Sequence, residues 1–458
     1  MNITVIGGGY IGIIASISFC GIGNTVCIVE FNKTRLNNLK AGQTDVYEPG
    51  INNFIDEAVK NKKLIFSGDL AGAVSASDAV IVAVSIADNG KDCDLTILNK
   101  AISIISSSLQ NNKYTPIVIM TNVPVGTCST ILENIKFARP DLILGKDYDL
   151  ISNPCHCREG CAIKDFMTQS RVIIGLSKQS EKAKKFIETL YSNLSIMNIP
   201  FIYTNFETAE LIRSASIALS SVRMAFINEI SDLCEKIGGN IDDVIHGISS
   251  DHKIYNNNMS ITASIGGSSY PRTIRILNNV AKSYGVNLKL LDAVLDSNSV
   301  RIHNIYEKII NLIKDKSSLS SKRVTILGLT FKPLTNDIRE SASLLIVEKL
   351  IQQRIPVYVY DPTYLPDSKN IVRIPDKVIN SEYFYLTKSV YEAVTQSNII
   401  VAMTEWAEFY SIDFSKVSEL MAKSYNKKPV FLDCKNSFIN KDLSQFKYIS
   451  TGMYEHEN

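Results

Sequence analysis

The stretch that decides the fold is Ile3-Thr4-Val5-Ile6-Gly7-Gly8-Gly9-Tyr10-Ile11-Gly12. Its first four residues form a short β-branched run, which is typical of a buried strand. The next six fit the pattern G-x-G-x-x-G, and the apolar spacing of residues 10–19 indicates a helix. A second β-branched run follows at residues 25–30. Strand, glycine turn, helix and strand in this order predict a βαβ unit with parallel strands.

The glycine turn predicts a site for a dinucleotide. Gly7 allows a tight turn, Gly9 lets the backbone approach a pyrophosphate, and Gly12 lets helix and strand pack closely. Tyr10 and Ile11 begin the helix, and a helix N-terminus favours phosphate groups.

An acidic residue stands where such a site needs one. Glu30 lies 18 residues after Gly12 at the end of the second strand, where a carboxylate can bind a ribose diol. It disfavours the 2′-phosphate of NADP by charge repulsion, although the nearby Arg35 could soften that preference. The alternative is a glycine-rich turn without a ligand, but strand, spacing and acid together favour NAD.

Alternation of strands and helices marks both ends of the chain, and long helices mark its middle. Strand-like runs occupy residues 79–85, 116–120, 171–174, 324–327, 357–360, 399–403 and 430–432. Between the two groups, residues 208–237 form an apolar-periodic stretch without Gly or Pro that ends at Gly238, and residues 288–315 form another. This order predicts two parallel-sheet lobes joined by a helical region, whose long helices could pair subunits.

The composition is that of a globular protein. The 458 residues suggest about three domains, with 45% hydrophobic and 21% charged residues. A net charge of +2 argues against a nucleic-acid binder that works by bulk charge. The apolar runs are shorter than the roughly 18 residues of a membrane helix, and the N-terminus lacks the basic start of a signal peptide. We therefore expect no nucleic acid, no membrane span and a cytoplasmic location.

Further motifs follow one another along nearly the whole chain, and with the glycine turn they resemble the UDP-glucose/GDP-mannose dehydrogenase family. They are Tyr47-Glu48-Pro49-Gly50, Val123-Pro124-Val125-Gly126-Thr127, Ser152-Asn153-Pro154, Arg158-Glu159-Gly160, Phe226-Ile227-Asn228-Glu229, Gly266-Gly267-Ser268, Gly328-Leu329-Thr330-Phe331-Lys332, Asp337-Ile338-Arg339-Glu340-Ser341 and Thr404-Glu405-Trp406. The resemblance implies two Rossmann-like lobes joined by a helical dimerisation region. The expected domains are 1–205 for NAD, 206–305 for dimerisation and 306–458 for the nucleotide sugar, in a homodimer.

The resemblance also implies a chemistry. The family uses two NAD to oxidise the C6 alcohol of a nucleotide sugar to a carboxylate, as a precursor of polysaccharides. A Cys thiolate attacks the aldehyde that the first hydride transfer leaves. A Lys and an Asn stabilise the oxyanion, and an Asp and a Glu help to activate the water that hydrolyses the thioester.

Six positions of that catalytic set differ in this chain. Ser269 stands for the Cys, Thr273 for the Asp, Arg213 for the Lys, Ile217 for the Asn, Cys155 for the Glu and Asn122 for a Thr. A serine hydroxyl is far less acidic than a thiol and needs a base beside it, arginine does not exchange protons, and isoleucine has no hydrogen bond to give. The substitutions together predict that the usual four-electron oxidation is lost or altered.

The binding residues are better kept than the reacting ones. Glu30, Arg35, Glu159 and Arg339 match family positions that contact NAD or lie near it. The residues expected at the nucleotide sugar, a UDP- or GDP-hexose, are Lys253, Gly266, Lys332 and Lys435. The alternative is that these residues persist as supports of the fold, because buried ion pairs also need their partners.

Three of the nine cysteines are crowded around one histidine, in Cys155-His156-Cys157 and at Cys161. Their spacing is not that of a structural zinc site and the ligand set is incomplete, so we expect no metal. Cys155 as a substitute nucleophile would need an activating neighbour, and replacement without a catalytic role is the favoured interpretation.

Three hypotheses about function remain. The first is an NAD-dependent oxidoreductase that acts on a nucleotide sugar and stops after one hydride transfer, which needs no cysteine. The second is a pseudoenzyme that binds NAD or a nucleotide sugar, either alone or together with an active relative. The third is the usual 6-dehydrogenase, working through Ser269 or Cys155. The substitutions favour the first two.

Overall fold

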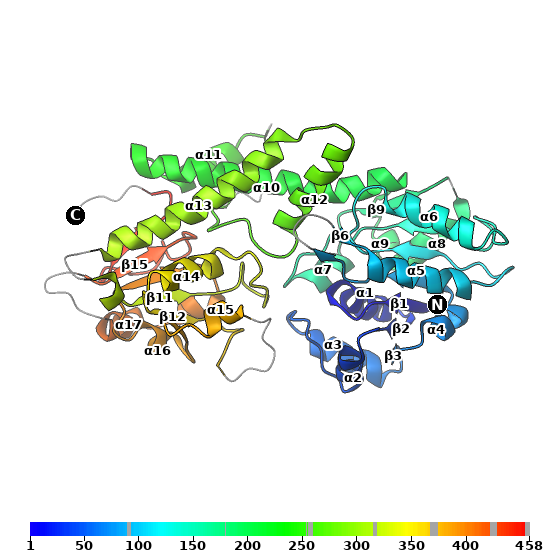
Figure 1. The fold of residues 1–458 in the computed structure, drawn as a ribbon, viewed down its shortest axis with the longest axis horizontal. Coiled ribbons are helices and arrows are strands. Elements are labelled where there is room, and N and C mark those ends of the chain that lie inside the picture. The colour runs from blue at the N-terminus through cyan, green and yellow to red at the C-terminus, as the bar shows by residue number, and fades with distance from the viewer. Residues whose placement is uncertain are drawn as a thin grey trace. The chain divides into compact units, whose positions relative to one another are not determined.

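A computed structural model describes residues 1–88, 93–178, 180–252, 254, 260–314, 318–366, 374–421 and 428–453. The chain forms two compact units, Met1–Ser216 with Arg275–Val286, and Ile217–Ile274 with Asn287–Asn458. Each unit contains a mostly parallel sheet with helices beside it (Figure 1). The predicted α/β class with two Rossmann-like lobes and a helical region is thus confirmed.

The sheet of the first unit has eight strands in the order β10-β9-β8-β7-β4-β1-β2-β3. The strands are β1 (Asn2–Ile6), β2 (Thr25–Val29), β3 (Leu64–Ser67), β4 (Ala79–Val82), β7 (Ile117–Ile119), β8 (Leu150–Ser152), β9 (Val172–Leu176) and β10 (Phe201–Thr204). A small antiparallel pair, β5 (Ala87–Asp88) and β6 (Cys93–Asp94), stands apart from them. β1 lies between β2 and β4, so the strand order reverses at β1 and the glycine turn lies at the switch point.

The helices of the first unit connect these strands. They are α1 (Tyr10–Gly21), α2 (Lys33–Lys40), α3 (Ile51–Lys60), α4 (Leu70–Ala76), α5 (Thr96–Ser108), α6 (Thr127–Ala138), α7 (Ala162–Met167), α8 (Glu181–Leu190) and α9 (Ser192–Ile196). Residues of β1 and β4 are almost wholly buried, which fits central parallel strands covered on both faces.

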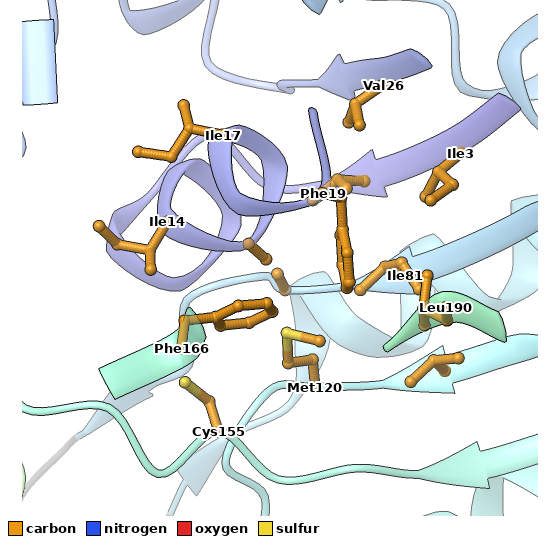
Figure 2. Packing of buried hydrophobic residues seen from close by; sticks show 14 of the residues in the cluster. Ile3, Ile14, Ile17, Phe19, Val26, Ile81, Met120, Cys155, Phe166 and Leu190 are labelled. Atoms are coloured by element: carbon orange, nitrogen blue, oxygen red, sulfur yellow. The ribbon is translucent and has the colours of Figure 1, made fainter. Parts of the chain in front are cut away.

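One pair of strands departs from the parallel pattern expected from the sequence. β8 and β9 run antiparallel, whereas the other neighbouring pairs of this sheet are parallel. The connection between them holds only the short helix α7, which packs on α1 through Phe166 and Phe19, with ring centroids 5.3 Å apart. The chain therefore re-enters the sheet at the carboxyl end of β8. Figure 2 shows this packing, with Cys155 and Met120 beside Phe166.

The middle of the chain is helical, as predicted. It consists of α10 (Phe206–Ile237), α11 (Ile241–Ser249), α12 (Tyr270–Ser283) and α13 (Lys289–Ile313). Gly238 follows α10 with a φ of +82°, so the predicted glycine stop takes the left-handed conformation that suits it. None of the helices within the described ranges is long and apolar enough to cross a bilayer.

The second unit contains a six-stranded parallel sheet in the order β13-β12-β11-β14-β15-β16. Its strands are β11 (Val324–Leu327), β12 (Val357–Tyr360), β13 (Phe384–Leu386), β14 (Ile399–Ala402), β15 (Val430–Asp433) and β16 (Lys447–Ser450). Besides α11, α13 and most of α10, this unit contains the helices α14 (Ala342–Gln352), α15 (Asp376–Ile379), α16 (Val390–Val394) and α17 (Phe414–Leu420), with 3₁₀ turns η1 (Leu319–Ser321) and η2 (Ala407–Ser411).

Candidate functional site

The glycine turn between β1 and α1 has no room for side chains. Gly7 has a φ of +107°, and a Cβ there would lie 2.7 Å from the Ala83 carbonyl oxygen. A Cβ on Gly9 would lie 2.9 Å from Ser85 Oγ, and one on Gly12 would lie 1.8 Å from the Gly7 carbonyl oxygen. Gly7 and Gly12 therefore require glycine because backbone atoms would be struck, whereas at Gly9 the Ser85 hydroxyl can rotate away; together the three form the close turn onto which a pyrophosphate can pack.

The carboxylate of Glu30 is fixed beside this turn. Its Oε2 accepts a hydrogen bond from the Gly8 N–H at 2.9 Å, and its Oε1 accepts one from the Asn32 N–H at 2.7 Å. A carboxylate accepts about four hydrogen bonds, so Glu30 keeps capacity for the hydroxyls of a ribose. The residues present therefore fit a dinucleotide at the turn.

Arg35, expected near the cofactor, is held by a second acid. Its Nε and Nη2 donate to Asp45 Oδ2 at 3.1 and 2.7 Å, and its Nη1 lies 3.8 Å from Glu30 Oε2. The hydrogen bond with Asp45 raises the pKa of the Arg35 guanidinium. A guanidinium between two carboxylates has little charge to offer a 2′-phosphate, so this arrangement supports NAD over NADP.

Glu48 is a residue that sequence reasoning noted in a motif but did not assign to the site. Its side chain is 5% exposed and accepts three hydrogen bonds. The donors are Tyr10 Oη at 2.5 Å, the Gly160 N–H at 2.7 Å and the Ala162 N–H at 2.6 Å. Glu48 therefore joins the start of α1 to the start of α7, and Glu159, a predicted cofactor neighbour, lies in the segment between Cys155 and α7.

The cysteine loop, residues 155–161, lies at the carboxyl end of β8. The backbone carbonyl of Cys155 accepts a hydrogen bond from Arg213 Nε at 2.6 Å, and the Cys155 side chain is 9% exposed. Figure 2 shows this side chain directed toward Phe166 in the apolar core. A hydrogen bond from the Cys157 thiol lowers the pKa of Cys155 to about 7, against the effect of burial, and the pKa of Cys157 is raised.

His156 stands between these two cysteines in the sequence and is neutral at ordinary pH. Burial, with the charges of Arg213 and Arg171, lowers the pKa of His156 to about 3. Its Nε2 is buried without a hydrogen-bond partner among the described residues. No cluster of three His, Cys, Asp or Glu side chains able to hold a metal was found in the described ranges.

The first unit brings together three of the six positions that the sequence resemblance predicts to be substituted. Asn122 follows β7 and Cys155 follows β8, which are neighbouring parallel strands, and the Cys155 N–H donates to the Met120 carbonyl at 3.4 Å. Arg213, on α10, reaches the same edge through its bond to Cys155. The Lys position is therefore occupied by a side chain that holds the loop in place.

The remaining positions lie in the second unit. Ser269 directly precedes α12, and its carbonyl accepts the Thr273 N–H at 2.9 Å. Ile217 lies buried on α10. Gly266 precedes Gly267, whose N–H donates to the Arg339 carbonyl at 2.9 Å.

The predicted ligand-binding cations of the second unit have protein partners. Arg339 makes a two-pronged bond to Asp337, with Nε and Nη2 each 2.8 Å from a carboxylate oxygen. Lys435 pairs with Glu405 at 3.2 Å, and Lys332 Nζ donates to the Pro333 carbonyl at 3.2 Å. Lys253 lies outside the described residues.

In the second unit, as in the first, a carboxylate at the end of a strand accepts a hydrogen bond from a neighbouring turn. In the second unit this carboxylate is also covered by other side chains. Asp361 follows β12, and its Oδ2 accepts the Leu329 N–H at 2.8 Å just after Gly328, as Glu30 accepts the Gly8 N–H. Here the same oxygen also accepts Trp406 Nε1 at 3.1 Å, and Asp361 is 0% exposed. Protein groups thus fill the hydrogen-bonding capacity of Asp361, whereas Glu30, 7% exposed, accepts two such bonds and keeps capacity for a ribose.

Three segments of the chain match domains of one known family. Residues 1–195 match the NAD binding domain of the UDP-glucose/GDP-mannose dehydrogenase family, residues 207–300 its central domain and residues 325–440 its UDP binding domain.

Individual proteins agree with these matches. The chain is 31% identical over 456 residues to the UDP-glucose 6-dehydrogenase of Rhizobium meliloti (strain 1021), covering 99% of both chains. It is 32% identical over 450 residues to the UDP-glucose 6-dehydrogenase TuaD of Bacillus subtilis (strain 168), covering 98% of this chain and 92% of that protein. Among solved structures, a UDP-glucose dehydrogenase from Pyrobaculum islandicum superposes with a TM-score of 0.85 at 22% identity, covering 99% of this chain and 98% of the other.

Proposed function

Because the chain belongs to the UDP-glucose/GDP-mannose dehydrogenase family, we propose that it binds NAD and a nucleotide sugar and stops after one hydride transfer. The observation that carries this proposal is a contrast within the first unit. The glycine turn and Glu30 have the close geometry of a dinucleotide site. Cys155 and Arg213 stand at the positions expected for the family's Glu and Lys. There the guanidinium of Arg213 donates a hydrogen bond to the backbone carbonyl of Cys155.

The proposed roles follow the contacts of each residue. Gly7, Gly9 and Gly12 with the N-terminus of α1 hold the pyrophosphate, and Glu30 holds the ribose. Bound there, NAD would supply a hydride acceptor, so that a C6 alcohol could become an aldehyde by giving up a hydride to it and its hydroxyl proton to water. We assign the nucleotide sugar to the expected domain 306–458. The other expected domains are 1–205 and 206–305, and the three family matches support this division.

Neither Cys155 nor Ser269 is well suited as the nucleophile of the second oxidation. It requires a thiol that reaches the aldehyde, and Cys155 is directed into the apolar core. Ser269 offers an alcohol, whose high pKa makes it a poor nucleophile without a neighbouring base. These two facts argue against the usual four-electron reaction through either residue.

The stoichiometry of NADH formation tests the proposal. Incubation with NAD and a panel of UDP- and GDP-hexoses, with hydroxylamine present to trap an aldehyde, is expected to yield one NADH per sugar and an oxime rather than a uronate. A yield of two NADH with a uronate product would contradict it. NAD binding by calorimetry without NADH from any sugar would instead support the second candidate, a pseudoenzyme, which the six substitutions favour.

We also propose that the protein is a homodimer that pairs through α10. Four large apolar side chains follow one another on this helix and are exposed, namely Leu219 (55%), Phe226 (50%), Leu233 (50%) and Ile237 (69%). Their separations of seven, seven and four residues place them on one stripe of the helix. A contiguous apolar stripe of this kind is typical of a surface that is buried against a partner.

Charges on this stripe are expected to separate the subunits. The double variant Phe226→Glu with Leu233→Glu should be a monomer by light scattering, where the unmodified protein is a dimer, because two carboxylates per subunit would have to be buried. Phe137→Glu is the matched control, since Phe137 is 91% exposed on α6, and it should leave the dimer unchanged. A dimeric double variant would place the interface elsewhere.

A further inference from the structure

We propose that Glu48 is a positioning residue that couples the glycine turn to the cysteine loop, so that NAD at the turn orders that loop. The inference rests on the proposed function in one respect, which is that NAD binds at the turn. It assigns a role to a carboxylate that neither the glycine motif nor the six substituted positions include.

The carboxylate of Glu48 accepts three hydrogen bonds from groups on two elements. Its Oε2 accepts Tyr10 Oη and the Gly160 N–H, and its Oε1 accepts the Ala162 N–H. The Gly160 N–H also lies 3.2 Å from Tyr10 Oη, which closes a triangle of donors and acceptors. Because the site is buried, a displacement of the Glu48 carboxylate would leave the Gly160 and Ala162 N–H groups without this acceptor, which is costly.

Tyr10 is the residue that connects this cluster to a ligand. It follows Gly9 and begins α1, so its backbone belongs to the turn that a pyrophosphate approaches. Burial and the neighbouring Glu48 raise the pKa of the Tyr10 hydroxyl, so it remains a donor at ordinary pH. A ligand that fixes the turn therefore fixes the direction of the Tyr10 hydroxyl as well.

The cysteine loop is held at both of its ends. Arg213 donates to the Cys155 carbonyl at one end, and Glu48 accepts from Gly160 and Ala162 at the other. Phe166 of α7 packs on Phe19 of α1, so the two helices that Glu48 bridges are also in apolar contact. The loop between these anchors carries His156 and Glu159. The hydrogen bonds of Glu48 therefore help to fix the positions of these two residues.

The loop contains its own reporters. Cys157 and Cys161 are free and half-buried, and their alkylation by iodoacetamide, followed by peptide mass spectrometry, measures how often the loop opens. Half-buried Cys27 on β2 is the internal reference for opening of the rest of the unit. The quantity of interest is the ratio of alkylation rates without and with NAD, at a NAD concentration that calorimetry shows to be saturating.

Two variants and one control separate coupling from a purely structural role. Glu48→Gln replaces one accepting oxygen with an amide that faces N–H donors. Tyr10→Phe removes only the hydroxyl and leaves the bonds of Glu48 to α7, so it keeps the test valid if Glu48→Gln does not fold. Tyr203→Phe is the matched control, because Tyr203 makes a tyrosine–glutamate bond to Glu188 in the same unit and away from the loop.

In the unmodified protein and in Tyr203→Phe, saturating NAD should slow alkylation of Cys157 and Cys161 by about tenfold, a usual size for coupling between sites. In Tyr10→Phe and Glu48→Gln the ratio should fall to about one, while Cys27 is unaffected. Equal protection of Cys157 and Cys161 from alkylation in all four proteins would overturn the inference. NAD binding that protects neither cysteine would also overturn it. Both outcomes would leave the proposed function intact. Absence of NAD binding by calorimetry to the unmodified protein would overturn both.

Discussion

Replacing Gly12 with alanine is expected to abolish NAD binding. A Cβ at this position would lie 1.8 Å from the Gly7 carbonyl oxygen, which is backbone and cannot rotate away. α1 would have to shift from β1, and the turn that both helix and ligand share would open. Overpacking of a well-packed site costs about 1–3 kcal/mol, and a cost of about 3 kcal/mol that falls only on the closed turn that binds the ligand corresponds to a loss of roughly 100-fold in affinity. Calorimetric titration with NAD measures the loss.

The control for this variant lies in the same helix. Gly21 is the last residue of α1, and a Cβ there would meet no atom within 4 Å. Gly21→Ala should therefore bind NAD as the unmodified protein does and unfold within about 1 kcal/mol of it. The single tryptophan, Trp406, lies in the second unit, so its fluorescence shows whether that unit stays folded in both variants. Normal NAD affinity in Gly12→Ala would mean that the turn is not the cofactor site.

The parts of the fold that could be predicted are those that leave a local pattern. The glycine spacing of the turn, the acid at the end of the second strand and the uninterrupted periodicity of α10 all lie within short windows of sequence. Each reflects backbone geometry or burial that neighbouring residues must satisfy together. For this reason the strands near these motifs and the ends of α10 and α13 agree with the predicted ranges to within about two residues.

The parts that could not be predicted depend on residues far apart in the chain. Glu48 accepts from backbone groups more than 100 residues later, and its motif alone says nothing about those donors. Arg213 was expected to stand for a reacting lysine, and only the fold shows its Nε on a loop carbonyl. The antiparallel direction of β9 follows from where α7 packs, which no local spacing reveals.

The identity of a residue also does not state which way its side chain points. Cys155 stands where the sequence resemblance predicts a Glu, and both a reactive and an inert thiol fit that prediction. Its low exposure and its contact with the core favour the inert thiol, whereas the hydrogen bond from Cys157, which lowers its pKa to about 7, favours the reactive one. Asp361 is a parallel case, because its position at the end of β12 matches Glu30, while the indole that seals it comes from a residue 45 positions later.

Asp361→Ala is expected to cause the largest loss of stability in the second unit. Two hydroxyl groups donate hydrogen bonds to the carboxylate, those of Thr330 and Thr363. Four N–H groups also donate to it, and they belong to Leu329, Thr330, Thr363 and Trp406. Alanine leaves these donors without their acceptor in a site that is 0% exposed. At roughly 1–3 kcal/mol for each unsatisfied buried donor, the free energy of unfolding should fall by more than about 4 kcal/mol.

Urea unfolding followed by Trp406 fluorescence measures this loss directly, because the reporter is itself one of the orphaned donors. Asp413→Ala is the matched control: Asp413 caps α17 with one exposed bond to the Lys416 N–H, so its removal should cost only about 1 kcal/mol. Asp361→Asn should lie between the two, since the amide keeps one accepting oxygen and turns its NH₂ group toward the N–H donors on the other side. Equal stability of Asp361→Ala and Asp413→Ala would contradict this prediction. It would show that the turn after β11 does not depend on Asp361 as an acceptor, and that the bond from Trp406 to Asp361 does not stabilise the fold.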